Sequence, residues 1–521
     1  MNRIEMLRRL RSHPHAWDMI VVGGGATGVG IAIDAASRGY DVLLLEQSDF
    51  GKGSSSRSTK LAHGGVRYLG QGSFGLVLEA LKERGLLFEN APHIVRELAF
   101  VVPNYDWWEA AFYGLGLKVY ELLAGRHGLS ATRTLSREET LEHLPTLKTD
   151  GLRGGAVYYD GQFDDARLLI HMVATAAEQG ATLLNYLQVA SLIKDAAGII
   201  KGVCAQDVET REEFLASARI VINATGPFSD RLRLAAEKYA KPMITPSQGT
   251  HLVFDGAFLS GESAIMVPKT SDGRVLFAIP WHSHALVGTT DTEVQHASLE
   301  PLAMEEEIDF ILSTAGEYLA KPPTRADVLS VFAGIRPLVR NEHGAITAAL
   351  SRDHVIQVDH SGLVSVMGGK WTTYRRMAQD CVDQAAQLAG LPQRPCRTEE
   401  LRIHGFHSEA AQFGALSVYG SDATAIQALA NSHPGCERKL HPALSYIRAE
   451  VVWATRNEMA RTVEDVLARR TRALFLNARA ALEVAADAAE LMATELGWNA
   501  TTKAQQIAAF QTVASNYLVR H

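Results

Sequence analysis

The sequence has 521 residues, which is more than one hydrophobic core usually accommodates, so two or three domains are expected. Hydrophobic residues at 47% and charged residues at 21% are typical of a soluble globular protein. The net charge of −7 disfavours nucleic acid as a partner. No apolar run reaches the ~18 residues of a membrane-spanning helix, and the N-terminal segment lacks the apolar core of a signal peptide.

The cysteines and histidines predict neither disulfide bonds nor a metal site. Four cysteines are scattered along the chain without a C-x-x-C pair, which indicates free thiols in a reducing compartment. His404 and His407 form one small pair, but no second pair of ligands completes a metal-binding spacing.

Residues 1–16 form a short basic lead with four arginines and one glutamate. Two interpretations stay open, a frayed solvated helix and a surface that favours anionic lipid.

Residues 18–46 have the pattern of a β-α-β unit that binds a dinucleotide. An apolar run leads into Gly23, Gly25 and Gly28, which have G-x-G-x-x-G spacing, and an alanine-rich helical segment follows. The glycines allow a tight turn, close approach of a pyrophosphate and packing of the helix on the strand. A second apolar run ends in Glu46, 18 residues after Gly28, where an acid is expected to meet a ribose hydroxyl.

A polar loop follows at 49–75 and contains Ser58, Thr59, Lys60, His63, Gly64, Arg67 and Tyr68. Such a composition often indicates a disordered linker. This loop, however, follows the second strand at the edge where ligands bind, and apolar residues interrupt its second half. We therefore expect its hydroxyl and N–H groups to bind a pyrophosphate and Arg67 to bind a second anion. His63 is either a neighbour of the cofactor or a stabiliser of the loop.

Residues 105–125 hold two of the seven tryptophans and three tyrosines. A buried helix and an amphipathic helix in a membrane interface are both consistent with this composition.

The middle of the chain predicts further strands, turns and helices. Asp164 is expected to cap a helix over 165–179, short strands follow up to 222, and a turn contains Gly226. Residues 244–340 indicate an antiparallel sheet interrupted by a helix at 304–319. A strand at 363–367 leads into a turn with Gly369, Lys370 and Thr372 and then a helix, whose positive end would stabilise negative charge.

Residues 398–521 are alanine-rich and helical in period, with a capping box at 462–465 and Gly497 as a helix stop. They predict a helical cap domain without visible chemistry.

Several motifs, in this order, resemble the FAD-dependent, aerobic glycerol-3-phosphate dehydrogenases. Besides the nucleotide unit they are Ser58-Thr-Lys-Leu-Ala-His-Gly-Gly-Val-Arg-Tyr-Leu, Asn223-Ala-Thr-Gly-Pro, Gly249-Thr-His-Leu-Val, Ile279-Pro-Trp with Val287-Gly-Thr-Thr-Asp, Gly334-Ile-Arg-Pro-Leu and Gly368-Gly-Lys-Trp-Thr-Thr-Tyr-Arg. The tail around 464–472 is similar to the C-terminal domain of that family. Trp371 departs from the pattern, since an aliphatic residue is expected after Lys370.

The resemblance implies an α/β plus α fold. A Rossmann-like FAD-binding domain (17–85, 150–243 and 341–390) would carry an inserted antiparallel substrate domain (86–149 and 244–340), as in D-amino-acid oxidase, and a helical domain at 398–521. It also implies non-covalent FAD, oxidation of sn-glycerol 3-phosphate to dihydroxyacetone phosphate, and a membrane quinone as electron acceptor. Peripheral attachment to the cytoplasmic face of the cell membrane and a homodimer would accompany this activity. No room appears for the insertion of the oxidase branch, which favours a dehydrogenase.

The expected site residues follow from the motifs and the resemblance. His251 is the candidate general base, because imidazole titrates near working pH. Arg67, Arg336 and Arg352, with Tyr68, are the candidates for the substrate phosphate, and Arg336 and Lys370 for charge near the reacting atoms. The residues expected at the cofactor are Gly23, Gly25, Gly28, Glu46, Ser58, Thr59, Lys60, His63, Gly64, Gly226, Gly369, Lys370 and Thr372.

Alternatives stay open. His251 could be a hydrogen-bonded core histidine, and Arg352 could pair with Asp353 on a surface turn. The chain could also oxidise another 2-hydroxy acid or an amino acid, which would need one arginine and an apolar pocket. A third possibility is a non-catalytic flavin-binding module that signals through residues 398–521.

Overall fold

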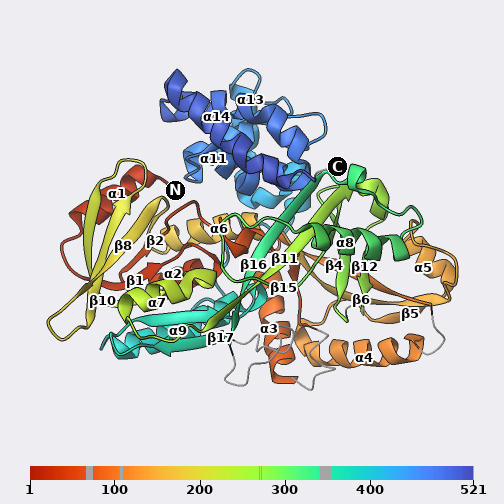
Figure 1. Ribbon diagram of the computed structural model, residues 1–521, viewed down its shortest axis with the longest axis horizontal. Coiled ribbons are helices and arrows are strands. Elements are labelled where there is room, and N and C mark those ends of the chain that lie inside the picture. Colours follow the sequence, from red (N-terminus) through yellow and green to blue (C-terminus); the bar gives the residue numbers. More distant parts are fainter. Residues whose placement is uncertain (66–73, 106–108, 269, 271–272, 341–353, 520–521) are drawn as a thin grey trace.

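The computed structural model shows two β-sheets side by side, with a group of helices above their junction (Figure 1). It describes residues 1–65, 74–105, 109–268, 270, 273–340 and 354–519. Within these ranges, no helix is long and apolar enough to cross a membrane.

The first sheet is the predicted nucleotide-binding sheet. Its main strands run in the order β17 (His354–Val358), β18 (Val364–Gly368), β10 (Glu213–Asn223), β1 (Trp17–Val22), β2 (Val42–Leu45), β7 (Thr182–Leu184). From β18 to β7 neighbouring strands are parallel, and an antiparallel extension is formed by β8 (Leu187–Lys194) and β9 (Ile200–Asp207). Parallel strands are buried on both faces, which explains the continuous apolar runs at β1 and β2.

Within the described ranges, five α-helices pack around this sheet. The helices are α1 (Arg3–Ser12), α2 (Ala26–Ser37), α6 (Asp165–Glu178), α7 (Ser229–Ala236) and α9 (Tyr374–Leu388). Helix α2 contacts both α6 and α9. Asp164 caps α6 as predicted, since its side chain accepts a hydrogen bond from the N–H of Arg167.

The second sheet is large and mostly antiparallel. Its order is β15 (Thr292–Glu293), β11 (Ile244–Asp255), β14 (His284–Gly288), β13 (Leu276–Trp281), β12 (Ala264–Val267), β4 (Val95–Asn104), β6 (Gly154–Phe163), β3 (Leu61–Ala62). β16 (Ser330–Val339) pairs with β11, and β5 (Arg133–Leu135) pairs with β6. The helices next to it are α3 (Phe74–Asn90), α4 (Glu109–Ala124), α5 (Arg137–His143) and α8 (Glu305–Tyr318).

The predicted domain boundaries differ from the structure at two strands. β3 and β6 fall inside ranges that the sequence assigned to the nucleotide domain, but they hydrogen-bond within the second sheet. The chain therefore crosses between the sheets within the predicted polar loop, which brings the first part of that loop, residues 49–60, to their junction.

The C-terminal region is helical, as predicted. It contains α10 (Ala423–Ser432), α11 (Arg448–Asn457), a π-helical turn (Asp465–Arg470), α12 (Ala473–Leu476), α13 (Ala478–Leu496) and α14 (Ala500–Ala514). Gly497 ends α13 in a left-handed conformation, with φ of 69°, and the capping box at 462–465 forms. Phe475 packs against Phe332 of β16, so this region shares a hydrophobic core with the second sheet.

Candidate active site

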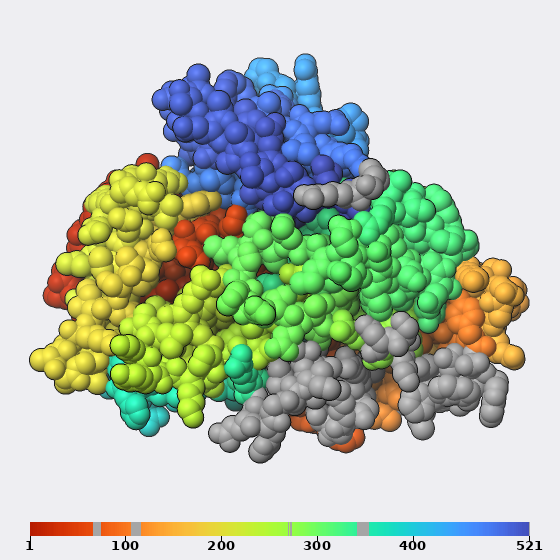
Figure 2. Space-filling view, in the orientation of Figure 1, coloured from red at the N-terminus to blue at the C-terminus, as the bar shows by residue number. Residues whose placement is uncertain are grey.

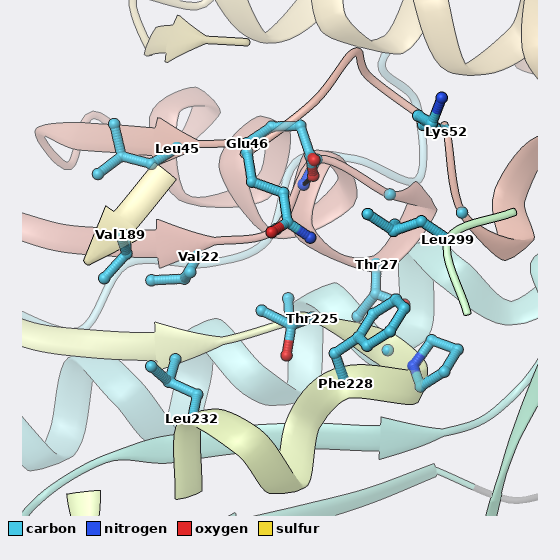
Figure 3. Close-up of a pocket in the computed structure, with 18 of the residues that line it drawn as sticks. Val22, Thr27, Leu45, Glu46, Lys52, Val189, Thr225, Phe228, Leu232 and Leu299 are labelled. Carbon is cyan, nitrogen blue, oxygen red and sulfur yellow. Dashed lines mark hydrogen bonds between the residues drawn. The ribbon is translucent and has the colours of Figure 1, made fainter. Parts of the chain in front are cut away.

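A first cavity of about 370 Å³ lies at the carboxyl ends of β1, β2 and β10. In the space-filling view of Figure 2 the cavity opens below the helical domain, which is blue. N-terminal residues, in red, are visible there between the yellow surface near residue 200 and the green surface of the middle of the chain (Figure 2). Glu46, Thr225 and Phe228 surround the same space (Figure 3). Gly226, with φ of 56°, lies in the second small-residue turn and also lines it.

The glycine motif forms one wall of this cavity. Gly23 has φ of 114°, and a Cβ on it would lie 2.5 Å from the carbonyl oxygen of Ala224. A Cβ on Gly28 would lie 1.9 Å from the oxygen of Gly23, so Gly28 serves helix packing, as expected. Gly25 is the N-cap of α2 and has no side chain to cap it. Helix α2 therefore presents the positive end of its dipole to the cavity.

Glu46 lines the cavity at the end of β2. Its carboxylate accepts hydrogen bonds from the N–H of Gly24 at 2.7 Å and of Ser48 at 2.8 Å. Burial raises the pKa of Glu46 above its ordinary value, and these hydrogen bonds act in the opposite direction. The acid is thus held by the glycine turn, next to the space for a ribose.

A second cavity of about 320 Å³ adjoins the first, since Ser54 and Pro337 line both. Many residues predicted for the site line it: Ser58, Thr59, His63, His251, Arg336, Gly369, Lys370 and Thr372. Four cationic side chains contribute to its wall, Arg57, Arg274, Arg336 and Lys370, whereas Asp291 is the one carboxylate among its described lining residues. This charge balance suits an anionic ligand.

His251 lies on β11 with its ring stacked on Phe332 at 4.9 Å. Its Nε2 is 2.9 Å from the hydroxyl of Thr59, and its Nδ1 is buried without a hydrogen-bond partner among the described residues. Burial, and then the charges of Lys60 and Arg336, lower the pKa of His251 well below its ordinary value. The imidazole is therefore neutral at pH 7 and has an unoccupied nitrogen.

Arg336 lies on β16, half-buried, and is held by Gln248 of β11 and by Thr289, which directly follows β14. It donates from Nη2 to the hydroxyl of Thr289 at 3.1 Å and from Nη1 to the carbonyl of Gln248 at 3.4 Å. Asp291 is 3.5 Å from Nη1. A Cβ on Gly249 would lie 2.4 Å from Nη2, so a larger residue here would displace the guanidinium.

The buried carboxylate of Glu307, on α8, connects β11 to residues 290–292 through hydrogen bonds. It accepts hydrogen bonds from the side chains of Gln248, Thr250, Thr290 and Thr292, at 2.6 to 2.8 Å, and from the N–H of Met304. Burial alone would raise the pKa of Glu307, but the hydrogen bonds, led by those of Thr250 and Gln248, lower it. Glu307 thus fixes both β11 and residues 290–292, which lie next to the groups that hold Arg336.

Lys370 precedes a short turn (Trp371–Thr373) that leads into α9, so its charge and the positive end of the helix lie on the same side of the second cavity. Trp371, the departure noted in the sequence, donates from its indole nitrogen to the carbonyl of Ser55 at 2.9 Å. It thereby connects the α9 turn to the polar loop. Thr372 accepts a hydrogen bond from the N–H of His63 at 3.3 Å.

For two predicted cofactor residues the structure corrects the sequence. Lys60 lines neither cavity, because its ammonium is fully buried 2.7 Å from Asp165. Burial lowers the pKa of Lys60 to about 8, against the opposing charge of Asp165. Gly64 also lies outside the linings and donates its N–H to the hydroxyl of Tyr120 at 2.7 Å. Both residues stabilise the loop through contacts outside the two cavities.

Arg67, Tyr68 and Arg352 lie outside the described residues. Arg274, which the sequence reasoning did not identify, lines the second cavity from the segment just before β13. Asp165 and Glu307 were also missed, because a single carboxylate on a helix has no sequence signal that distinguishes it from a solvent-exposed acid. No group of three or more metal-ligating residues occurs in the described ranges.

The residues present fit a flavin dinucleotide. The helix N-terminus and the glycines that admit no Cβ provide a cradle for a pyrophosphate, and Glu46 stands at the ribose position. The adjoining cavity continues away from this cradle to His251, Arg336 and Lys370.

Comparison with protein families identifies two domains. Residues 18–375 match the FAD dependent oxidoreductase family, and residues 363–503 match the C-terminal domain of alpha-glycerophosphate oxidase.

Individual relatives point the same way. The mitochondrial glycerol-3-phosphate dehydrogenase of Rattus norvegicus is 40% identical over 528 residues, covering 94% of this chain and 72% of the relative. The mitochondrial enzyme of Arabidopsis thaliana is also 40% identical, with 94% and 84% covered. The solved glycerol-3-phosphate dehydrogenase from Bacillus halodurans, complexed with FAD, is 29% identical and superposes with a TM-score of 0.81 over 99% of this chain and 98% of that one.

These matches confirm the predicted fold, the FAD cofactor and the prediction that the chain is an enzyme. The non-catalytic alternative is thereby removed. The chain belongs to the glycerol-3-phosphate dehydrogenase family of FAD-dependent oxidoreductases.

Proposed function

We propose that this chain oxidises sn-glycerol 3-phosphate to dihydroxyacetone phosphate and passes the electrons to a membrane quinone. The observation that carries the substrate assignment is the second cavity, where Arg274, Arg336 and Lys370 line the wall with the neutral His251 beside the flavin-binding cradle, in addition to Arg57, which pairs with Glu300. A 2-hydroxy acid or an amino acid would need a single arginine for its carboxylate. The names of the relatives support a phosphate substrate.

In this proposal the substrate phosphate binds to arginines at the cavity wall. Arg274 and Arg336 are the described candidates, and Arg67 and Arg352, with Tyr68, stay predictions. Each charge-assisted hydrogen bond contributes roughly 1.5–3 kcal/mol, so two or three of them select a phosphate over a plain alcohol.

His251 lines the second cavity and accepts the proton of the C2 hydroxyl, and the hydroxyl of Thr59, 2.9 Å from Nε2, holds its ring. The substrate dianion raises the basicity of this imidazole when both are in the cavity, because an opposite charge favours the protonated form. Arg336 orients the reacting oxygen, and Lys370 with the start of α9 stabilises negative charge. Bound FAD supplies the acceptor for the hydride that leaves C2.

Flavin bleaching without oxygen tests the reaction. Glycerol 3-phosphate is expected to reduce the bound flavin, whereas glycerol and lactate are not. Reduction of the flavin by lactate or by an amino acid would assign a different substrate class. A flavin that stays oxidised with glycerol 3-phosphate would refute glycerol 3-phosphate as the substrate.

We further propose peripheral attachment to the inner face of the cell membrane through α3 and α4. These helices contact each other at the lower side of the molecule in Figure 1 and expose apolar side chains, Phe74 and Leu78 on α3 and Val119 and Leu122 on α4. Apolar side chains exposed on adjacent helices favour an interfacial location. The homodimer stays a prediction from the resemblance.

Cosedimentation with vesicles of phosphatidylethanolamine and phosphatidylglycerol tests this surface. Leu122→Asp, at a side chain that is 80% exposed, is expected to weaken vesicle binding. Leu215→Asp, at a side chain that is 77% exposed on β10, is the matched control and should bind as wild type. Equal binding by both variants would exclude α4 as the contact.

A further inference from the structure

The helical C-terminal region reaches back to residues 49–57, the first part of the polar loop. Asp49, fully buried, receives hydrogen bonds from Arg469 at 2.5 Å and from Arg470 at 2.6 and 2.9 Å. The ammonium of Lys52 lies 2.6 and 2.7 Å from the two carboxylate oxygens of Glu464. Both contacts join residues more than 400 positions apart in the chain.

Two further contacts hold the end of the same loop. Arg472 donates from Nη2 to the carbonyl of Ser56 at 2.7 Å. Arg57 pairs with Glu300 at 2.7 Å, and the hydroxyl of Tyr517 donates to the same carboxylate at 2.9 Å. The guanidinium of Arg57 also lies over the ring of Tyr517 at 5.8 Å. The C-terminal region thus touches the loop at four positions, directly or through Glu300.

This loop forms a wall of both cavities. Residues 51–55 line the first cavity, and Ser54 and residues 57–59 line the second. Lys52 is the residue of this wall that contacts the C-terminal region while it borders the dinucleotide cavity (Figure 3). The shape of both cavities therefore depends on where the C-terminal region holds the loop.

Each carboxylate in the contact between residues 49–57 and the C-terminal region faces a positive charge. Burial opposes ionisation of Asp49, but the charges of Arg470 and Arg469 outweigh it and lower its pKa to about 2. Burial likewise opposes ionisation of Glu464, and Arg469 and Lys52 lower its pKa to about 2. The contacts are therefore charge-assisted at neutral pH, which makes them stronger than neutral hydrogen bonds.

We propose that the C-terminal helical domain is part of the cofactor-binding apparatus, in which Glu464 acts as a positioning residue for FAD through Lys52. Glu464 does not line either cavity, whereas Lys52 lines the first. Glu464 fixes the ammonium of Lys52 and thereby the backbone of residues 51–55. The proposal concerns FAD alone and holds whichever substrate the enzyme oxidises.

FAD titration into deflavinated full-length protein tests this role. Glu464→Gln is expected to raise the Kd for FAD roughly tenfold, since it removes a charge-assisted contact. Glu495→Gln is the matched control, because Glu495 is buried to a similar degree (15% exposed against 14%) and pairs with Arg456 at 2.6 Å inside the helical domain. The control should leave the Kd within about twofold of wild type.

A double-mutant cycle separates positioning from general stability. In a Lys52→Met background, Glu464→Gln should change the Kd much less than it does alone. An equal effect in both backgrounds, or a lower unfolding temperature of the apoprotein with an unchanged Kd, would overturn the proposal. If Glu464→Gln does not fold, Lys52→Met alone provides the second variant: it is expected to raise the Kd for FAD roughly tenfold, and a wild-type Kd would overturn the proposal.

Discussion

Replacing Glu307 by alanine tests whether one buried carboxylate holds the active-site strands. The substitution removes the acceptor of five hydrogen bonds, four of them from side chains of β11 and of residues 290–292. Breaking a buried, hydrogen-bonded charge costs about 3–5 kcal/mol, because the remaining donors lose their partner. We expect Glu307→Ala to reduce the free energy of unfolding by this amount.

Urea unfolding of the FAD-saturated protein, followed by tryptophan fluorescence, measures the effect. Glu306→Ala is the control on the same helix, since Glu306 is exposed, and should change the free energy of unfolding by less than about 0.5 kcal/mol. A loss below about 1 kcal/mol for Glu307→Ala would refute the reasoning.

The same group predicts a pH dependence. The hydrogen bonds hold the pKa of Glu307 in the folded protein below its ordinary value of about 4.3. Its contribution to stability is therefore complete above that ordinary value and is lost as the pH falls through the lowered folded-state pKa. The stability difference between wild type and Glu307→Gln should accordingly narrow in acid and stay constant between pH 6 and 8.

Three further predictions concern the two cavities. Arg336→Ala should keep FAD bound but lower kcat/KM by about 10²–10⁴-fold, from the loss of two charge-assisted hydrogen bonds, and wild-type turnover would remove Arg336 from the site. His251→Ala should slow flavin reduction in stopped flow by about 10²–10⁴-fold, and because the pKa of His251 is lowered, the acidic limb of the wild-type kcat/KM profile should lie below pH 6.5. Gly23→Ala should weaken FAD binding at least tenfold in titration, because its Cβ would lie 2.5 Å from the oxygen of Ala224; normal affinity would contradict this geometry of the turn.

The sequence predicted the parts of the fold that depend on local signals. The glycine spacing at 23–28, the capping box at 462–465 and the helix stop at Gly497 each involve residues a few positions apart, where propensity and hydrogen bonding decide the structure. The predicted helix at 304–319 is found as α8.

What the sequence missed depends on contacts between distant residues. Glu307 accepts a hydrogen bond from Thr250, 57 residues away, and the ammonium of Lys60 is held in the interior by Asp165, 105 residues away. β6 was assigned to the nucleotide domain because strand patterns do not specify a partner, and its pairing with β4 is set by tertiary structure. Arg274 gave no signal, since an arginine after a turn is usually solvated.

The contact between Lys52 and Glu464 has a consequence for biosynthesis. The two residues are separated by 412 positions, and a ribosome that adds 5–20 residues per second needs roughly 20–80 s to make that stretch. The glycine cradle emerges early and stays incomplete for most of translation. If Glu464 positions FAD as proposed, stable capture of the flavin is a late event. A nascent or truncated chain that ends before Glu464 then presents the nucleotide-binding sheet to chaperones and proteases before the cofactor protects it.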